Sequence, residues 1–423
     1  MGNVQLKKKR KVPELRFPEF SGEWEEKKLG EVVSFKKGKG IPKRTLTEYG
    51  TKCILYGQLY TTYNEIITGI SSYTDIDEQK LLFGNMGDIL IPSSGETALD
   101  MSLASALLVD NVALGGDINI LRPKNNTIDS KFLSYQINSA RKIDLARIAE
   151  GASVVHLYNN NLKDVIVVNP KDTAEQQKIG NFFYTIDKKL ELQQEKINAL
   201  KEYKKGMMQR IFSQEISFKD DDGKDFPDWE EKRLEDMGEF LTSSVDKKIK
   251  ENEIIVNLCN YMDVYNRLEI RNNNLDILNK TSATEMQIKN NNLLKGDILI
   301  TPSSETSDDI GHSVVIWEDL KNTVYSYHLL RFRPHIKMDL KFSNYWFNSE
   351  AVRKHFIIRA QGATRFTISI NNIKDIIVKY PTIREQEKIG KLLYSIDKKI
   401  ELEEEKLEKY KKFKKGLMQR MFV

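Results

Sequence analysis

The sequence predicts an α+β protein: two similar mixed α/β domains separated by two long antiparallel helices that form a coiled coil, with an internal pseudo-twofold repeat. Three observations predict this class. A stretch of 38 residues occurs twice, short strand patterns precede each copy in the same order, and both copies carry sustained apolar heptads. Because the period is about 210 residues, the repeating unit is a whole domain followed by a helix, and not a solenoid turn.

The repeated stretch runs from Glu175 to Phe212 and again from Glu385 to Phe422, with 22 of 38 positions identical. Its apolar residues recur in steps of three and four, the a/d pattern of a coiled coil. Polar residues interrupt both seams at the same places, and such residues fix register at a cost in stability. The interrupting residues are Gln193 and Lys204 in the first copy and Glu403 and Lys414 in the second. Two amphipathic helices that each pack only on their own domain are the alternative, but the sustained heptads favour a mutual coiled coil.

Bulk properties limit the class of protein. A chain of 423 residues accommodates two or three domains, and no apolar run approaches the ~18 residues that span a membrane. Two isolated cysteines, Cys53 and Cys259, suit a reducing cytoplasm, and we expect no secretory signal. The net charge is only +5, so any nucleic-acid surface must be a local basic patch.

The chain starts with a basic run, Lys7–Lys11, of a kind that is normally solvated and sometimes touches nucleic acid. Its sequence KKKRKV is similar to a nuclear import signal, which we interpret as a coincidence or an appended segment. A first repeated motif follows at Arg16–Val33 and Asp225–Phe240, where Trp24 aligns with Trp229.

Within each half, the same patterns follow in the same order. Two tyrosine-rich segments read as strands, and GDILI segments read as apolar strands that end in hydroxyl-rich loops. A second strand, a helical segment that ends before a glycine, and a closing NNxKDxxV motif come next. The corresponding ranges are Cys53–Tyr63 and Cys259–Ile270, Gly87–Thr97 and Gly296–Thr306, Leu121–Pro123 and Phe332–Pro334, Lys131–Ala149 and Lys341–Ala360, and Gly151–Pro170 and Gly362–Pro381.

These patterns divide the chain into six parts. They are a basic arm at 1–16, a first domain at 17–170, a central helix at 171–214, a linker at 215–225, a second domain at 226–381 and a C-terminal helix at 382–423.

Catalytic motifs are absent from the sequence. It has no GxxxxGK[ST] phosphate loop, no GxGxxG fingerprint and no Asn-Pro-Pro-aromatic methyltransferase signature. Its five histidines have no metal-ligand spacing. The group Asp228, Glu230 and Lys232 imitates a nuclease set, but its spacing is too tight and a solvated charge cluster explains it better. We therefore predict no catalytic residues and no metal site.

The repeated motifs resemble the specificity (S) subunit of type I restriction–modification enzymes. The resemblance spans essentially the whole chain, and the helical motif EQxKIGxxxYxIDKKxELxxEK carries most of it. It implies two target-recognition domains, each reading one half of a bipartite double-stranded DNA target, with the helices as spacer and docking surface. It also implies a non-catalytic role in a bacterial, cytoplasmic and nucleoid-associated complex. Two methyltransferase subunits would bring S-adenosylmethionine, and restriction/translocase subunits would bring ATP- and Mg-dependent chemistry.

Candidate DNA-binding residues follow from residue type and position. Basic residues in mobile loops suit phosphate, while amide, tyrosine and arginine side chains on loops suit base edges or stacking. Hydroxyl groups on loops could reach base edges, but serines matched between the halves suit phosphate better, because domains that read different sequences should not share base-reading residues. The alternatives are solvated charges, turn chemistry and core packing. The candidates are Lys36, Lys37, Lys39, Lys43, Arg44, Tyr60, Tyr63, Ser93, Ser94 and Thr97 in the first half, and Lys247, Lys248, Lys250, Tyr261, Tyr265, Arg267, Ser303, Ser304, Thr306, Gln361 and Arg365 in the second. A protein-only coiled-coil scaffold and a stand-alone DNA-modifying enzyme remain the competing functions.

Overall fold

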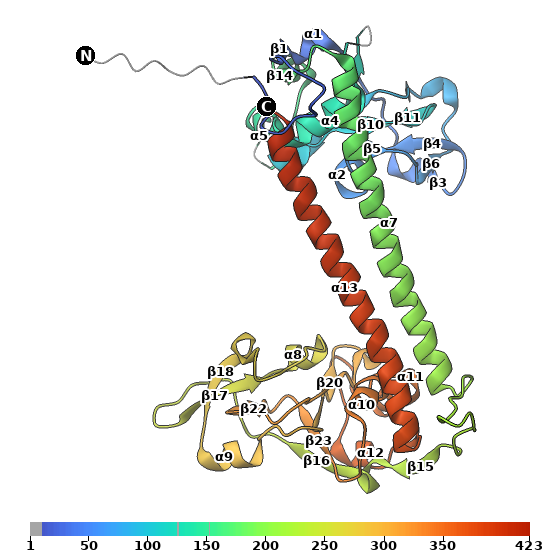
Figure 1. Cartoon of the computed structure of the whole chain (residues 1–423), viewed down its shortest axis with the longest axis vertical. Coiled ribbons are helices and arrows are strands. Elements are labelled where there is room, and N and C mark those ends of the chain that lie inside the picture. The colour runs from blue at the N-terminus through green and yellow to red at the C-terminus, as the bar shows by residue number, and fades with distance from the viewer. Residues whose placement is uncertain (1–10, 125–126, 152) are drawn as a thin grey trace. The chain divides into compact units, whose positions relative to one another are not determined.

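A computed structural model describes residues 11–124, 127–151 and 153–423, which form two compact units. The first unit combines the chain up to Glu195 with Glu405–Val423, and the second is Lys196–Glu404. Two long helices, α7 (Thr173–Phe212) and α13 (Ile383–Met421), each contribute one end to each unit. Figure 1 shows the two helices side by side within each unit.

The first unit holds two five-stranded sheets and two short strand pairs. Parallel and antiparallel neighbours are mixed, since β10 pairs antiparallel with β8 and parallel with β5. In spatial order, the first sheet is β2 (Val33–Lys37), β12 (Ile118–Pro123), β8 (Ile89–Pro92), β10 (Ser105–Leu107) and β5 (Ile66–Ile67), and the second is β3 (Leu46–Thr47), β6 (Ser72–Thr74), β4 (Thr51–Ile54), β11 (Val112–Leu114) and β7 (Phe83–Gly84). The strand pairs are β1 (Glu25–Lys28) with β14 (Ile166–Asn169), and β9 (Ser94–Gly95) with β13 (Val155–His156).

The second unit repeats this plan with fewer strands. Its sheets are β16 (Gly238–Thr242), β23 (Leu330–Pro334), β19 (Ile298–Ile300) and β21 (Ser313–Val315), and β18 (Asn279–Ala283), β17 (Ile254–Cys259) and β22 (Thr323–Tyr325). The strand pairs are β15 (Glu230–Arg233) with β25 (Ile377–Tyr380), and β20 (Ser303–Ser304) with β24 (Phe366–Thr367). The predicted mixed α/β class and the internal repeat are confirmed.

Helices cover the sheets at matching places in the two units. In the first they are α1 (Leu29–Val32), α2 (Gln58–Thr61), α3 (Ala98–Met101), α4 (Ser130–Ser139), α5 (Lys142–Arg147) and α6 (Asn159–Lys163). In the second they are α8 (Tyr261–Tyr265), α9 (Glu285–Asn290), α10 (Leu340–Trp346), α11 (Glu350–Arg359) and α12 (Ile370–Lys374). Short 3-10 turns lie at Lys43–Thr45, Glu78–Lys80, Leu234–Asp236, Leu275–Ile277 and Ser307–Asp309.

Two local predictions were wrong. The tyrosine-rich segments are not continuous strands: each strand ends before a short helix, α2 or α8, that carries the tyrosines. In the second domain a capping box between Asn260 and Asp263 starts that helix. Each predicted helical segment is two helices, and in the second domain Ser349 stands at the N-cap of α11 after a three-residue break.

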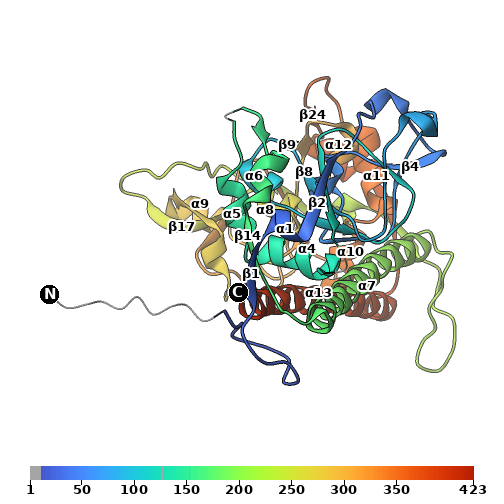
Figure 2. The same cartoon turned by 90° about the horizontal axis from the view of Figure 1, so that it is seen from above.

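The motif that starts each domain pairs with the motif that closes it. Strand β1 runs antiparallel to β14, and β15 to β25. Figure 2 shows β1 and β14 next to α1 in the first unit. Leu29 and Leu234 are fully buried behind these pairs, which explains why the motifs recur.

The predicted coiled-coil seam is the buried side of both long helices. In the first unit Ile179 and Phe183 of α7 are buried with Leu417 and Met421 of α13, in one apolar cluster. In the second unit the buried seam residues are Ile197 and Ile211 of α7 with Ile389, Leu393, Ile396 and Ile400 of α13. Because the start of α7 meets the end of α13 in the first unit, and the reverse holds in the second, the helices run antiparallel.

The basic arm is only partly within the described residues. Lys7 to Arg10 lie outside them, and the segment from Lys11 packs on the first unit, contrary to a fully solvated arm. Lys11 pairs with Glu26 at 2.7 Å, and the Leu15 N–H donates to the carbonyl of Arg420 at 2.9 Å.

Candidate nucleic-acid interface

Each domain brings its serine loop against its closing segment in a short two-stranded ribbon. In the first domain β9 follows the buried strand β8 and pairs with β13, so that Ser94 faces His156. In the second, β20 follows β19 and pairs with β24, so that Ser303 faces Thr367. Figure 2 labels β9 and β24, one from each ribbon. Two segments that the sequence left separate therefore form one surface in each domain.

The ribbon of the second domain gathers several predicted residues. The Arg365 guanidinium donates to Ser303 Oγ at 3.4 Å, and the Tyr261 hydroxyl donates to the Ser303 carbonyl at 2.8 Å. Burial, and then the positive charges of Lys247 and Arg365, lower the pKa of His328, and both of these cations are exposed. The surface is therefore locally basic, as binding to a phosphate backbone requires.

Sequence reasoning missed two residues of this surface, Tyr327 and His328. Their rings lie 3.9 Å apart, and Tyr327 is 51% exposed. An exposed aromatic ring beside cations suits stacking on a base. The first domain has Gly116 and Asp117 at the equivalent place before β12, so the tyrosine–histidine pair is particular to the second domain.

In the first domain, Lys36 and Lys37 lie at the end of strand β2 and not on the predicted loop. Asn159 donates its side-chain amide to the carbonyl of Lys36 at 3.2 Å, and Lys37 pairs with Asp117 at 3.5 Å. Both partners of that ion pair are about half exposed, so phosphate can compete for Lys37.

A histidine that sequence reasoning did not select, His156, lies in the first ribbon. Its Nδ1 is 3.0 Å from Ser94 Oγ, and its ring stacks on Tyr158 with centroids 5.9 Å apart. Tyr158 is 47% exposed, so it is the aromatic face available on this side. Neither His156 nor Tyr158 is matched by a histidine or tyrosine in the second domain. A difference between the two halves is therefore the sequence signal that could have identified them.

Three of the four predicted tyrosines lie on short helices rather than on strands: Tyr60 on α2, and Tyr261 and Tyr265 on α8. Burial, helped by the neighbouring Tyr56 hydroxyl and nearby carboxylates, raises the pKa of Tyr60. In the second domain Tyr261 stacks on Tyr265 with centroids 5.9 Å apart. Burial also raises the pKa of Tyr261, so both hydroxyls remain protonated donors at neutral pH.

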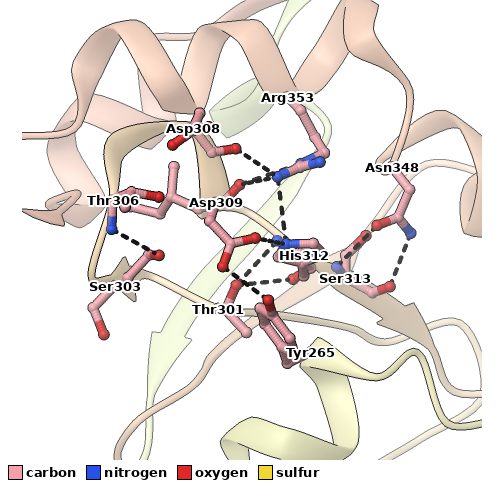
Figure 3. A network of polar contacts seen from close by, with 12 residues as sticks. Tyr265, Thr301, Ser303, Thr306, Asp308, Asp309, His312, Ser313, Asn348 and Arg353 are labelled. Atoms are coloured by element: carbon pink, nitrogen blue, oxygen red, sulfur yellow. Dashed lines mark hydrogen bonds and ion pairs between the residues drawn. The ribbon is translucent and has the colours of Figure 1, made fainter. Parts of the chain in front are cut away.

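A polar network holds the loop after β20 against α8 and α11 (Figure 3). The Tyr265 hydroxyl donates to Asp309 Oδ2 at 2.9 Å, and His312 Nε2 lies 2.8 Å from Asp309 Oδ1. Arg353 donates to the carbonyl of Asp308 at 3.1 Å. Although burial opposes it, hydrogen bonds from His312 and Tyr265 lower the pKa of Asp309, whereas burial lowers that of His312. The network fixes the loop that carries Thr306.

Other predicted residues have mixed placements. Ser93, Ser94 and Ser304 are buried, which favours the structural alternative for them, and Thr97 caps α3 by accepting the Asp100 N–H at 3.2 Å. Tyr63 and Arg267 line grooves beside the long helices, away from the ribbons. Exposed residues from the predicted set are Lys36, Lys37, Lys39, Lys43, Arg44, Thr97, Lys247, Lys248, Lys250, Arg267, Thr306, Gln361 and Arg365.

The lysines that interrupt the coiled-coil seam anchor each domain to both helices. In the first unit Lys414 of α13 lies 2.6 Å from Asp187 of α7, and the Tyr135 hydroxyl of α4 donates to the same carboxylate at 2.6 Å. The lysine also lies over the ring of Tyr135 at 5.3 Å. Burial raises the pKa of Asp187 despite this lysine.

The second unit repeats this anchor residue for residue. Lys204 of α7 lies 2.6 Å from Asp397 of α13, the Tyr345 hydroxyl donates to that carboxylate at 2.6 Å, and the lysine lies over the tyrosine ring at 5.1 Å. Each seam lysine thus joins both helices and one domain.

The helix starts carry a second repeated contact, with one difference. Gln176 and Gln386 each accept the backbone N–H at the N-cap of the neighbouring helix, Asp129 or Asp339, at 2.9 and 3.1 Å. Beside them, Arg16 donates twice to Glu175, at 2.7 and 2.8 Å. The equivalent Glu385 accepts from Trp229, and burial raises its pKa.

Two searches of the described part of the chain gave negative results. Among residues 11–124, 127–151 and 153–423, no group of three or more His, Cys, Asp or Glu residues is placed to hold a metal ion. No helix in that same part is long and apolar enough to cross a membrane.

Comparison with known proteins defines the class. The model of the family described as "Type I restriction modification DNA specificity domain" matches residues 21–202 and again 227–412. The chain therefore belongs to the type I restriction–modification DNA specificity family and carries two of its recognition domains in one polypeptide. These matches cover both ribbons and most of both long helices.

Individual relatives agree with this assignment. The chain is 23% identical over 425 aligned positions to the type I restriction enzyme MjaVIII specificity subunit of Methanocaldococcus jannaschii, covering 96% of this chain and 92% of that protein. It shares its fold with the S subunit of a type I restriction-modification system from M. genitalium, with a TM-score of 0.57, 15% identity and coverage of 97% and 99%. A structure described by complex assembly and conformational transition of the type I R-M system has the same TM-score and identity, with coverage of 94% and 97%.

Proposed function

We propose that this chain reads DNA without catalysing a reaction, and that each recognition domain reads one half of a bipartite duplex target. The observation that carries the proposal is the repeated ribbon, whose backbone pairing recurs while its exposed side chains differ between the domains. Two domains that recognise different DNA sequences but share one fold need the same backbone and different exposed side chains. Exposed lysines would hold phosphates and so position each domain, while the ribbon side chains would contact base edges.

The chemistry of the assembly is assigned to partners. Two methyltransferase subunits would dock on the long helices, and restriction/translocase subunits would join them. S-adenosylmethionine, ATP and Mg would enter with those subunits, and this chain would need no cofactor of its own. Support comes from the absent catalytic motifs and from the equal anchors Lys204–Asp397 and Lys414–Asp187, which present both helices alike to two equal partners. The complex would act in the bacterial cytoplasm, on the nucleoid.

The helices would also set the spacing of the two half-sites. Helix α7 has 40 residues, or ~60 Å at 1.5 Å per residue, against about 34–36 Å for one turn of B-DNA. Removing one heptad from both helices should therefore change the preferred gap. An unchanged gap would contradict the spacer role.

The central experiment sequences the methylated positions on DNA exposed to the chain together with its modification subunits. A bipartite methylated motif, and duplex binding that weakens steeply with salt and with Lys→Ala changes at positions 36–44, is the expected result. Turnover by the lone chain with S-adenosylmethionine, ATP and Mg would instead indicate a stand-alone enzyme. Absence of DNA binding, even with the modification subunits, would indicate a protein scaffold.

A further inference from the structure

Each unit contains a groove between its recognition domain and the long helices. The groove of the first unit has a volume of about 980 Å³ and that of the second about 970 Å³, within the range of small-molecule sites. Each groove lies wholly within its own unit. Five equivalent helix residues line both grooves: Lys411, Lys414, Lys415, Met418 and Gln419 in the first, and Lys201, Lys204, Lys205, Met208 and Gln209 in the second.

The two grooves differ in charge, although their helix residues match. The lining of the first groove is balanced, with four lysines and four carboxylates. The lining of the second has seven lysine and arginine side chains and three carboxylates, a formal excess of four positive charges. One position shows a direct reversal, because Glu65 follows a Tyr-Asn pair in the first domain and Arg267 follows the equivalent pair in the second. The second groove therefore carries positive charge that the first does not.

Glu65 completes an ion pair, whereas Arg267 has no such partner. The Glu65 carboxylate lies 3.1 Å from Nζ of Lys414, the seam lysine of the first groove. Among the residues that the structure describes, the Arg267 guanidinium forms no ion pair and no side-chain hydrogen bond. Burial within the groove, and then the positive charge of Arg353, lower the pKa of Arg267. Two like charges held close together in this way favour the binding of an anion.

The backbone at Arg267 has a conformation that arginine rarely adopts. Its φ is +54°, in the left-handed region, and its N–H donates to the carbonyl of Val264 at 3.0 Å, which closes the turn after α8. Strained backbone of this kind concentrates at functional sites. A guanidinium that is positioned for a ligand accounts for both the strain and the unpaired charge.

The other cations of the second groove suit the same kind of ligand. Arg353 donates to the carbonyls of Asp308 and Ile310, which fix its guanidinium without neutralising its charge (Figure 3). Lys205 and Lys354 form no ion pair within the described part of the chain. Guanidinium groups bind phosphate through two parallel hydrogen bonds, and lysines bind it as point charges. The groove thus combines both kinds of phosphate ligand.

We propose that the groove of the second unit binds a small, multiply charged phosphate anion, with Arg267 as its principal contact and Arg353, Lys205 and Lys354 around it. The balanced groove of the first unit does not bind this ligand. The site is separate from the ribbons and does not depend on the DNA-reading function proposed above.

The test is isothermal titration of the full chain with inorganic tripolyphosphate, for which we expect one site per chain. R267E places a carboxylate where the first groove has one, and it should weaken binding roughly 10-fold or more. R267Q removes the charge without reversing it and should weaken binding less. K321E changes the net charge as much as R267E does, at an exposed lysine outside the groove, and should keep the wild-type affinity.

A second titration with ATP distinguishes two sources of the phosphate. Tighter binding of ATP than of tripolyphosphate would indicate a nucleotide, and equal binding would indicate that the phosphate chain alone is recognised; both support the site. Melting curves check folding, and tripolyphosphate should raise the melting temperature of wild type and K321E but not of R267E.

Four outcomes would overturn the proposal. They are the absence of tripolyphosphate binding, two sites per chain, equal affinity of R267E and wild type, and an equal loss in R267E and K321E, which would reflect net charge alone. Duplex DNA that displaces tripolyphosphate, and that itself binds R267E more weakly, would place Arg267 in the DNA interface and would also overturn a site for small anions.

Discussion

The seam lysine Lys414 should stabilise the first unit strongly, although it lies in a coiled-coil position that normally holds an apolar residue. Its Nζ lies 2.6 Å from Asp187 and 3.1 Å from Glu65, and its side chain is 12% exposed. K414M keeps the length and the contact with Tyr135 but leaves two carboxylates without their cation.

The loss in free energy of unfolding that we expect for K414M lies between two limits. Breaking a buried pair costs about 3–5 kcal/mol, and losing an exposed pair costs about 0–1 kcal/mol. Asp187 keeps the hydrogen bond from Tyr135 and is 23% exposed, so the estimate for K414M is about 2–3 kcal/mol. Replacing both partners, in D187N/K414M, removes the uncompensated charge and should recover about half of this loss.

The assay is urea unfolding followed by tryptophan fluorescence, with hydrogen exchange of residues 179–195 and 405–421 to assign the transition to the first unit. K415M, at an exposed neighbouring lysine, is the matched control and should lie within about 0.5 kcal/mol of wild type. Strictly additive effects of D187N and K414M in the double variant would refute the reasoning, because they would show no coupling between the two charges.

The pH dependence gives a second check on the same variant. Burial already raises the pKa of Asp187, and loss of the lysine raises it further. The folded state then binds this proton more tightly than the unfolded state, so the variant loses stability as pH rises from about 4 through the folded pKa. The deficit of K414M should therefore be small in acid and largest at neutral pH.

Three further predictions concern other contacts. G362A should destabilise loop 361–367 by about 1–2 kcal/mol or more, because Gly362 has a φ of +146° that alanine adopts only with strain. DNA binding should then fail at one half-site only, which binding to duplexes mutated in either half measures. Burial lowers the pKa of His312 in the folded state below its unfolded value, so the wild type should lose stability as pH falls below about 6.5. H312Q should lack this loss, and melting curves between pH 7.5 and 5 measure the difference. E175Q should cost about 1.5–3 kcal/mol by weakening two charged hydrogen bonds from Arg16. E385Q should change stability by less than about 1 kcal/mol, because Glu385 has a raised pKa and one carboxylate oxygen without a hydrogen-bond partner. Equilibrium unfolding of E175Q and E385Q compares their free energies of unfolding.

The fold was largely predictable because its strongest determinants are local and repeated. The heptads placed the buried seam, and interruptions at Lys204 and Lys414 marked the positions that meet Asp397 and Asp187. The α2 and α8 segments were predicted as strands because tyrosine generally favours strands, whereas a capping box between Asn260 and Asp263 starts a helix in the second domain.

The candidate interface was only partly predictable, because it is assembled from segments far apart in the chain. Nothing near Ser303 indicates that it meets Arg365, and the pairing arises from the ribbon of β20 and β24. His156 and His328 were not predicted, because the candidates were chosen by residue type and position and no histidine was among the types considered. Ser94 and Ser303 occupy the same place in the two ribbons, and Ser94 is buried.

Residues 405–423 belong to the first unit, so this unit folds from two segments that are far apart in the sequence. The ring of Phe422 stacks on that of Phe183 with centroids 5.6 Å apart, and its centroid lies 5.4 Å from that of Phe132. The Arg141 guanidinium donates to the carbonyl of Val423 at 2.8 Å. Once residues up to 195 have been synthesised, most of the core of the first unit is present. The end of α13 that packs against this core is still missing. The first unit is completed only after the second domain has been made, so loss of residues 405–423 would damage the recognition domain that is farther from them in sequence.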